Sequence, residues 1–483
     1  MKFKKFIAVC LGMLGLIGLA QVAEAGEIKG DINNISAATG MANYQEFVPK
    51  ASILIDAQTG YVMWQDQPDL VRPIASLSKI MTAYLVLEEI GKGKIKLEDK
   101  FTPNEKVMNI SQIYALSNNK MVAGVEYTLD ELLYLLFIPS SNAATVMLAE
   151  IVLPNDEAGF VNLMNKTAEN LGMTNTTYYN ATGATASSFN GYYLPVGIDP
   201  DGDNTSTAKD LSILVFNLLK KHPNVLKYTS VAEYTVHPGT NSEEKFESYN
   251  YSLPGKTYAY QGMDGLKTGS SPSAAFGLVA TVKREETRLI EVILGSGSWD
   301  NQAAETERHP IANGIFNKGF EQFEYKKVLA AGEQKVEGED LILKEDLYGL
   351  VQKDQENNLS FVVKDNQIAL KTDLSLVTDK ISQQTVAVDK KEISKKQQVK
   401  DNLNNEITKQ SRSILVHFQD YFLPIILGLF GLIAITISTF FKEKNGNTRR
   451  RRQSTLGRII MLLGVLAVLV GMGISLMEYF NLL

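Results

Sequence analysis

Three short polar motifs carry the residue types that serine-based acyl transfer needs: residues 76–79 (SLSK), 140–142 (SSN) and 267–269 (KTG). A serine hydroxyl is a poor nucleophile near neutral pH. A lysine can take its proton when burial or a neighbouring cation lowers the pKa of the lysine. We therefore predict that Ser76 attacks a carbonyl carbon and that Lys79 is the general base.

The first motif is expected at the start of a buried helix. Residues 74–90 follow Pro73, have apolar residues at helical spacing and contain no proline or glycine. The spacing puts Lys79 one turn beyond Ser76 on the same face, and free N–H groups of the first turn can help to hold an oxyanion. The same motif in isolation is typical of a capping serine with an exposed lysine. The apolar neighbours of Lys79 favour the catalytic interpretation.

The second motif follows an apolar helical run, residues 132–138, which Pro139 ends. The turn beyond it can direct two polar side chains into a cleft. We predict that Ser140 relays a proton between Lys79 and the leaving amine, and that Asn142 holds both Lys79 and the substrate peptide. An ordinary helix-start cap is the alternative, and both interpretations can hold together.

The third motif precedes two expected strands, residues 275–282 and 289–294, so it should lie on or beside a sheet at the cleft edge. There an extended peptide could pair with the strand. We predict that Lys267 and Thr268 bind a terminal carboxylate, that Gly269 allows close approach of the ligand, and that the N–H of Ser270 is a second oxyanion donor.

In this order the motifs resemble the signature of penicillin-binding proteins and serine β-lactamases. More specifically, the chain resembles the low-molecular-weight penicillin-binding proteins of the D-alanyl-D-alanine carboxypeptidase kind, the S11 serine peptidases typified by penicillin-binding protein 5. The resemblance covers about residues 46–385 and also rests on the segments 51–60, 72–83, 180–183, 206–211 and 264–269. The chain departs from the family pattern after Ser140, where Gly-Asn-Asp is frequent, and at Ser270, where an aromatic residue or histidine is frequent.

The resemblance implies a serine-type carboxypeptidase, a hydrolase that removes the terminal D-alanine from peptidoglycan stem pentapeptides through a Ser76 acyl-enzyme. It also implies covalent inhibition by β-lactam antibiotics and no cofactor. A D,D-transpeptidase would use the same acylating residues. A class A β-lactamase is disfavoured because no E-x-x-L-N segment lies between Asn142 and Lys267 to activate water. A catalytically silent wall-binding scaffold is disfavoured because all the catalytic side chains are present.

The N-terminus predicts export. Residues 1–25 have a lysine-rich start, an apolar core and an Ala-Glu-Ala site before Gly26, as in a secretory signal peptide. The only cysteine, Cys10, lies inside this segment. The mature chain therefore has neither disulfides nor a thiol nucleophile.

The C-terminus predicts a multi-pass anchor in the cell membrane. Residues 421–441 and 459–477 are apolar runs long enough to be transmembrane helices, and the loop 442–458 between them contains four consecutive arginines. The positive-inside rule places this loop in the cytoplasm and the catalytic domain on the extracellular, cell-wall face. A single span followed by an interfacial helix is the alternative.

The expected fold class is α/β (α+β): an antiparallel sheet flanked by helices, as in serine β-lactamases and transpeptidases, followed by a small all-β domain and the membrane helices. Strands 51–56 and 61–65 should join 275–282 and 289–294 in that sheet. The expected domain order is a leader (26–45), a catalytic domain (46–322), a small β-domain (323–385) and a polar stalk (386–420). The net charge of −6 argues against a nucleic-acid partner.

No metal site is expected. Residues 199–204 and Asp210 imitate the start of a calcium loop but lack its sixth-position glycine and twelfth-position glutamate, so an acidic surface turn is the preferred interpretation. The histidines, which we interpret as surface or loop residues, have no metal-like spacing: His222, His237, His309 and His417.

Overall fold

The computed structural model describes residues 27–28, 30–390, 404–411, 423–438, 442–443, 452–453 and 455–481. It divides into two compact units, residues 1–390 and 391–483. The predicted signal peptide and most of the predicted stalk lie outside the described residues.

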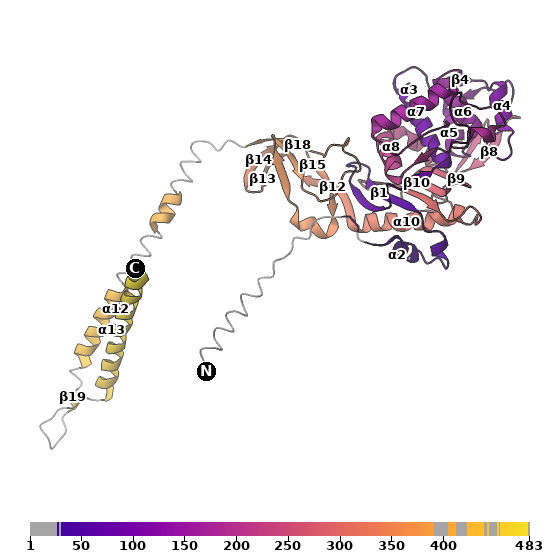
Figure 1. The fold of residues 1–483 in the computed structure, drawn as a ribbon. Coiled ribbons are helices and arrows are strands. Elements are labelled where there is room, and N and C mark those ends of the chain that lie inside the picture. The colour runs from indigo at the N-terminus through magenta and orange to yellow at the C-terminus, as the bar shows by residue number, and fades with distance from the viewer. Residues whose placement is uncertain are drawn as a thin grey trace. The chain divides into compact units, whose positions relative to one another are not determined.

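A five-stranded antiparallel sheet forms the centre of the first unit (Figure 1). Its order is β2 (Val62–Asp66), β1 (Ala51–Asp56), β11 (Thr287–Ser296), β10 (Ala275–Arg284) and β9 (Met263–Ser271). β1 pairs with β11 along its whole length, from Ala51 opposite Leu294 to Asp56 opposite Leu289. This confirms the predicted sheet, in which early and late segments of the chain meet.

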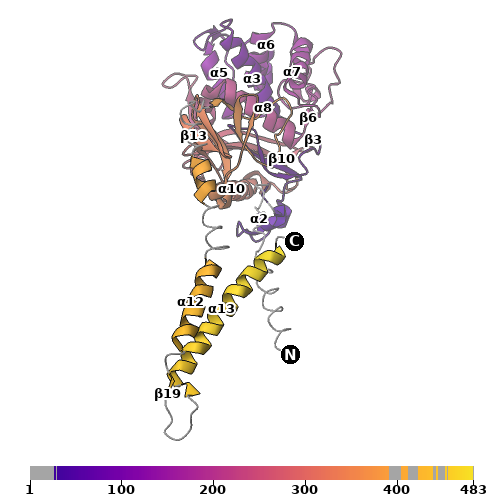
Figure 2. The same cartoon turned by 90° about the vertical axis from the view of Figure 1, so that its left-hand side faces the viewer.

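Helices cover both faces of this sheet, which explains why every residue of β1 is buried. Figures 1 and 2 show α3, α5, α6, α7 and α8 on one face and α2 with α10 on the other. The larger lobe contains α3 (Lys79–Gly91), α4 (Glu105–Ser111), α5 (Leu129–Phe137), α6 (Asn142–Val152), α7 (Glu157–Leu171), α8 (Ala208–Lys221) and α9 (Leu226–Thr229). The opposite face carries α2 (Ile32–Ala37) and α10 (Ala304–Gln322).

Short elements connect these layers. The two-stranded pairs are β3 (Arg72–Pro73) with β6 (Thr205–Ser206), β4 (Lys100–Phe101) with β5 (Tyr127–Thr128), and β7 (Glu233–Val236) with β8 (Glu244–Glu247). The 3-10 turns are η1 (Tyr44–Glu46), η2 (Ala75–Ser78), η3 (Ala186–Phe189), η4 (Pro223–Val225) and η5 (Lys353–Asn358). Capping residues fix several helix starts. Thr128 and Glu131 form a capping box on α5, and Thr207 caps α8.

The segment predicted as a polar leader contains buried apolar residues. Ile28, Ile32 and Ile35 belong to the core cluster that also includes Ile311 and Ile315 of α10. Ile32 and Ile35 lie three residues apart on one face of α2, and this face packs on α10. The leader is therefore part of the folded unit from Ile28 onward.

β-Strands follow α10 in the segment where the sequence predicts a small β-domain. It contains the pair β12 (Phe323–Leu329) and β15 (Leu347–Gln352), and a five-stranded sheet ordered β13 (Gly332–Val336), β14 (Glu339–Leu343), β18 (Val386–Lys390), β17 (Gln367–Leu370) and β16 (Phe361–Lys364). β18 lies in the segment that we expected to begin the stalk. Val388 is buried in the core of this domain, so the alternation of residues 386–390 is that of a half-buried strand.

The second unit contains two apolar helices, α12 (Leu423–Ser438) and α13 (Thr455–Asn481), and the short pair β19 (Lys442–Glu443) with β20 (Arg452–Gln453). Among the described helices, only α13 is long and apolar enough to cross a membrane, over Thr455–Met472. The described part of α12 is apolar but too short to cross a membrane by the same measure of length. One candidate membrane helix is thus found where the sequence predicts two spans.

Candidate active site

The first motif forms a tight turn before a buried helix. Residues 75–78 make the 3-10 turn η2, and α3 begins at Lys79, so the expected helix starts as a 3-10 segment. The Nζ atom of Lys79 lies 2.9 Å from the Oγ of Ser76. Ser76 is half-buried and Lys79 is fully buried. The alternative of a capping serine with an exposed lysine is therefore wrong for this motif.

Lys79 has further partners on two other segments. Its Nζ donates to the Oδ1 of Asn142 and to the backbone oxygen of Thr182, each at 2.9 Å. These two oxygens can only accept hydrogen bonds. A neutral amine has two N–H groups and one lone pair, so if both N–H groups point at these acceptors the lone pair is left for the hydroxyl proton of Ser76. This arrangement suits a base.

Burial and charge lower the pKa of Lys79. Desolvation lowers this pKa well below its ordinary value, and the positive charge of Lys267 lowers it further. The neutral form of Lys79 is thereby favoured at a lower pH than for an exposed lysine. The protein thus favours the neutral amine, which is the form of Lys79 that can accept a proton.

The second motif lies on the turn between α5 and α6. Ser140 has a φ of +59°, and its buried Oγ has no hydrogen-bond partner among the described residues. Ser141 is the N-cap of α6 and accepts from the N–H of Ala144. Asn142 starts α6, and its Nδ2 donates to the backbone oxygen of Ser117 at 3.0 Å. The cap interpretation therefore applies to Ser141, whereas the side chain of Asn142 contacts Lys79 and Ser117 and the Oγ of Ser140 is left without a partner among the described residues.

The third motif lies on β9, the edge strand of the central sheet. Lys267 is buried, and its Nζ donates to the backbone oxygen of Thr268 at 3.0 Å. A Cβ on Gly269 would lie 2.6 Å from the backbone oxygen of Ile74 and 3.0 Å from the N of Leu77. Glycine is required here because β9 approaches the turn of the first motif so closely. The approach brings Ser270 into the neighbourhood of Ser76.

A second glycine supports the same turn from another side. Gly183 has a φ of +90°, and a Cβ there would lie 1.8 Å from the backbone oxygen of Ala75. Thr182, one residue earlier, supplies the oxygen that Lys79 contacts. Residues 180–183, which entered the sequence analysis only as a family landmark, therefore form one wall of the site.

Arg308 is a site residue that the sequence analysis missed. It lies on α10 with no exposed surface, and its Nη1 donates to the Oγ of Ser270 at 3.1 Å. Its Nε and Nη2 have no hydrogen-bond partner among the described residues. The sequence did contain a signal for this residue. Arg308 has helical spacing to Ile311, Ala312 and Ile315, and a charged residue on an otherwise apolar helix face is unusual.

The site concentrates positive charge. Burial lowers the pKa of Lys267 to about 7, and the charge of Arg308 contributes to this shift. Burial also lowers the pKa of Arg308, to about 10, so Arg308 stays cationic near neutral pH. A substrate carboxylate placed between these groups would relieve their mutual repulsion and raise the pKa of Lys267.

His309 corrects one interpretation made from the sequence. Its side chain is fully buried on α10, and its Nε2 accepts from the backbone N–H of Tyr251 at 3.1 Å. His309 therefore lies in the protein interior, on a helix, and not in a surface loop. Asp210 likewise has internal partners, the N–H and hydroxyl groups of Asn175 and Thr176. Across the described residues, no group of three or more histidine, cysteine, aspartate and glutamate side chains is arranged to hold a metal ion.

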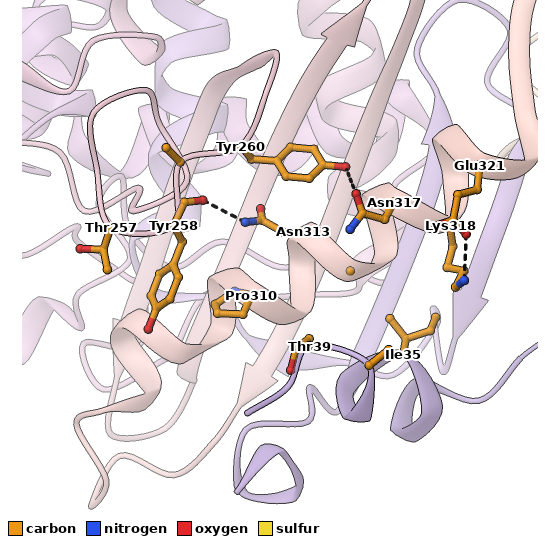
Figure 3. A pocket seen from close by; sticks show the side chains of 13 residues that line it. Ile35, Thr39, Thr257, Tyr258, Tyr260, Pro310, Asn313, Asn317, Lys318 and Glu321 are labelled. Carbon is orange, nitrogen blue, oxygen red and sulfur yellow. Dashed lines mark hydrogen bonds and ion pairs between the residues drawn. The ribbon is translucent and has the colours of Figure 1, made fainter. Parts of the chain in front are cut away.

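A separate pocket of about 520 Å³ lies between α2, α10 and residues 257–260 (Figure 3). Asn313 and Asn317 line it from α10, and each is hydrogen-bonded to the 257–260 segment, to the backbone oxygen of Tyr258 and to the hydroxyl of Tyr260. None of the three motifs lines this pocket. α10 therefore supplies Arg308 to the candidate active site and other residues to this second pocket.

The comparisons with known proteins agree with the motifs. The family model described as D-alanyl-D-alanine carboxypeptidase, peptidase S11, matches residues 38–298. The chain belongs to this family. By family it is a serine-type D-alanyl-D-alanine carboxypeptidase, a hydrolase. Residues 325–389 match a second model, a domain of unknown function (DUF1958).

Individual relatives show how far the similarity extends. The D-alanyl-D-alanine carboxypeptidase DacF of Bacillus subtilis is 32% identical over 293 residues, which are 59% of this chain and 67% of the relative. The carboxypeptidase DacC of Escherichia coli is 29% identical over 281 residues, 57% of this chain and 62% of the relative. The chain thus spans roughly two thirds of these curated relatives.

A solved structure confirms the fold. The crystal structure of a peptidoglycan synthesis regulatory factor (PBP3) from Streptococcus pneumoniae aligns with a TM-score of 0.61 at 25% identity. It covers 71% of this chain and 99% of that chain. The expected penicillin-binding-protein fold of sheets and helices is confirmed.

Proposed function

We propose that this protein is a membrane-anchored D-Ala-D-Ala carboxypeptidase that removes the terminal D-alanine from peptidoglycan stem pentapeptides through a Ser76 acyl-enzyme. The observation that carries the proposal is the 2.9 Å contact between the Nζ of a fully buried Lys79 and the Oγ of Ser76. Three further site segments surround this pair. The exported, cell-wall location follows from the predicted signal peptide.

Substrate binding uses the edge strand and the cations beside it. The stem peptide extends along β9, whose outer edge has no neighbouring strand in the described sheet. Its terminal carboxylate binds Lys267, Thr268 and Arg308. Asn142 holds the peptide from the opposite side. This places the last amide bond over Ser76.

Acylation then proceeds with Lys79 as the base. Lys79 takes the hydroxyl proton of Ser76 while Oγ attacks the carbonyl carbon of the last amide bond. The N–H groups of Ser76 and Ser270 stabilise the oxyanion. Ser140, whose Oγ has no other partner among the described residues, passes a proton to the departing amine of D-alanine. Water subsequently hydrolyses the ester and restores Ser76.

β-Lactams react at the same serine. Their amide carbonyl acylates Ser76, and the carboxylate of the drug takes the place of the substrate carboxylate. Slow hydrolysis of this ester makes the drug an inhibitor. A β-lactamase would need a general base for the deacylating water, and the sequence offers no E-x-x-L-N segment for one.

The membrane anchor is proposed to be a helical hairpin of α12 and α13. Close packing within the second unit supports this, because a Cβ on Gly431 would lie 2.6 Å from the backbone oxygen of Gly464. Small residues allow such close helix contacts in membranes. The two helices lie side by side in both views (Figures 1 and 2). The basic loop 442–458 would then remain in the cytoplasm.

The test is the release of free D-alanine from a defined pentapeptide by the purified full-length protein. We expect release by the wild type and labelling of the wild type by a fluorescent penicillin. Ser76→Ala should abolish both. Penicillin labelling that survives this substitution would refute Ser76 as the nucleophile, and absence of D-alanine release by a labelled wild type would refute the carboxypeptidase assignment.

A further inference from the structure

Arg308 is a fully buried cation with few polar contacts. Its Nη1 donates to the Oγ of Ser270 at 3.1 Å and lies 3.5 Å from the backbone oxygen of Gly269. Its Nε and Nη2 have no hydrogen-bond partner among the described residues. A single short hydrogen bond does not fix the plane of a guanidinium, because the other torsions of the side chain remain free. Packing must therefore hold this group in place.

The ring of Phe276 supplies that packing. The Cζ of Arg308 lies 5.8 Å from the centroid of this ring, within the range of a cation–π contact. Phe276, on β10, stands directly opposite Ser270 of β9 in the strand register. Directly opposite residues of an antiparallel pair have their side chains on the same face of the sheet. One strand pairing thus places the hydroxyl and the ring that contact Arg308 side by side.

Trp299 supports the ring of Phe276. The two rings are stacked, with centroids 5.6 Å apart and an interplanar angle of 19°. Trp299 lies on the loop between β11 and α10 and is 36% exposed, whereas Phe276 is 1% exposed. The indole therefore shields the Phe276 ring, and the guanidinium beside it, from solvent.

The loop that carries Trp299 is held against the start of α10. Gly297 has a φ of +67°, and a Cβ there would lie 2.4 Å from the Cβ of Ala304, the first residue of α10. The Nε2 of Gln302 donates to the backbone oxygen of Trp299. Arg308 lies about one turn beyond Ala304 on the same helix. The loop and the helix therefore fix Trp299 and Arg308 relative to each other.

The aromatic contacts act on a group that keeps its charge. Burial lowers the pKa of Arg308 to about 10, so the guanidinium stays cationic near neutral pH. Its charge reaches the third motif, since it contributes to the lowered pKa of Lys267. Both a cation–π contact and the attraction between a guanidinium and a carboxylate are stronger where water is excluded. A displaced or hydrated guanidinium would attract the substrate carboxylate less.

We propose that Phe276 and Trp299 are positioning residues that hold the guanidinium of Arg308 beside Ser270. Through Arg308 they determine how strongly the enzyme prefers a peptide with a free C-terminal carboxylate over one with an uncharged end. The proposal rests on the proposed carboxypeptidase function and deepens it, because both residues lie outside the three motifs. Loss of the indole admits water beside the Phe276 ring and weakens the hold on Arg308.

The experiment compares kcat and KM for a pentapeptide with a free C-terminal carboxylate and for the same peptide with a C-terminal amide. The ratio of the two kcat/KM values measures the preference for the carboxylate. We expect Trp299→Ala and Phe276→Leu to lower this ratio about three- to tenfold, through a higher KM for the free acid and with little change in kcat. Trp299→Phe keeps a ring that can stack and should restore most of the preference.

A second arginine on aromatic rings provides the matched control. The Cζ of Arg284, at the other end of β10, lies 4.5 Å from the ring centroid of Phe320 and 4.5 Å from that of Tyr260. Phe320→Leu makes the same change as Phe276→Leu beside an arginine that has no contact with the three motifs among the described residues. We expect this variant to keep the wild-type ratio. Trp299 is partly exposed, so Trp299→Ala tests the proposal even if the buried Phe276 variant fails to fold.

Each outcome bears on the proposal. A lower ratio in Trp299→Ala, its recovery in Trp299→Phe and a wild-type ratio in Phe320→Leu support it. An unchanged ratio in Trp299→Ala overturns it, as does an equal loss of kcat/KM with both peptides, which would indicate a merely structural role. An equal fall of the ratio in Phe320→Leu also overturns it. If the wild type is labelled by penicillin but releases no D-alanine, the carboxypeptidase function itself has failed, and the specificity role fails with it.

Discussion

The site contains two buried lysines that lie in different surroundings. Lys79, at the start of α3, contacts the oxygens of Ser76, Asn142 and Thr182, each at 2.9 Å. Lys267, on β9, donates to the backbone oxygen of its neighbour, and the guanidinium of Arg308 lowers its pKa. Burial lowers the pKa of both.

The contrast shows that burial alone does not assign a role to a lysine. Lys79 is enclosed by oxygen atoms, two of which can only accept hydrogen bonds, and its remaining contact is the hydroxyl of Ser76, the proposed nucleophile. Lys267 has another cation beside it and needs an anion to balance the charge. The first environment suits proton transfer and the second suits carboxylate binding.

Replacing Lys79 should have the largest effect. Lys79→Arg keeps a long cationic side chain, but arginine stays protonated and cannot accept the proton of Ser76. We expect the second-order rate constant of penicillin acylation to fall by about 10²- to 10⁴-fold. Stopped-flow labelling with a fluorescent penicillin measures this rate. Near-wild-type acylation would show that Lys79 is not the base.

Replacing Lys267 should have a smaller effect of a different kind. Lys267→Gln removes one charge-assisted hydrogen bond to the substrate carboxylate, worth about 1.5–3 kcal/mol, so we expect kcat/KM for a pentapeptide to fall by about 10- to 100-fold. A pentapeptide with an amidated C-terminus is the control, because it should lose little further activity in this variant. Equal losses with both peptides would contradict a role in carboxylate binding.

The smallest expected effect is on the pH dependence of kcat/KM. This dependence should distinguish the role of Lys79 from that of Lys267. Activity rises with pH as Lys79 loses its proton, at a pH below the ordinary lysine range. It falls when Lys267 loses its positive charge, and the pKa of Lys267 in the free enzyme is about 7. Lys267→Arg keeps the positive charge at higher pH. Only the falling limb of the profile should therefore move, to higher pH.

The pH test has a clear contrary result. A profile of Lys267→Arg in which the falling limb stays in place would mean that another group loses its proton there. A shift of the rising limb instead would mean that the roles of the two lysines have been exchanged.

Much of the sheet could be predicted because its strands have local signals. The expected strand 51–56 matches β1 in both of its bounds, and the expected strands 275–282 and 289–294 lie within β10 and β11. Each is an apolar run between turn residues. The edge position of the KTG motif was also predictable, since two further strands follow it closely in the chain.

The burial of the leader, of residues 386–390 and of Arg308 and His309 depends on contacts between distant segments, which no local sequence pattern indicates. The leader reads as polar, but Ile32 and Ile35 are buried against α10. Val386 begins a strand whose partners in the sheet are β14 and β17. Arg308 was not singled out and His309 was interpreted as a surface or loop residue, but both are fully buried because β9 and the segment around Tyr251 contact them.

The sequence by itself determined which groups are available: a serine and a lysine one turn apart, a serine-asparagine turn and a lysine-threonine-glycine strand, in a chain with a predicted signal peptide. Only the tertiary structure decided that these groups meet. Lys79 contacts Asn142 and Thr182 across 63 and 103 residues of sequence, and Arg308 joins β9 from a helix on the far side of the sheet. Spacing along a helix fixes a neighbour one turn away, whereas contacts between distant segments depend on how the lobes pack around the sheet.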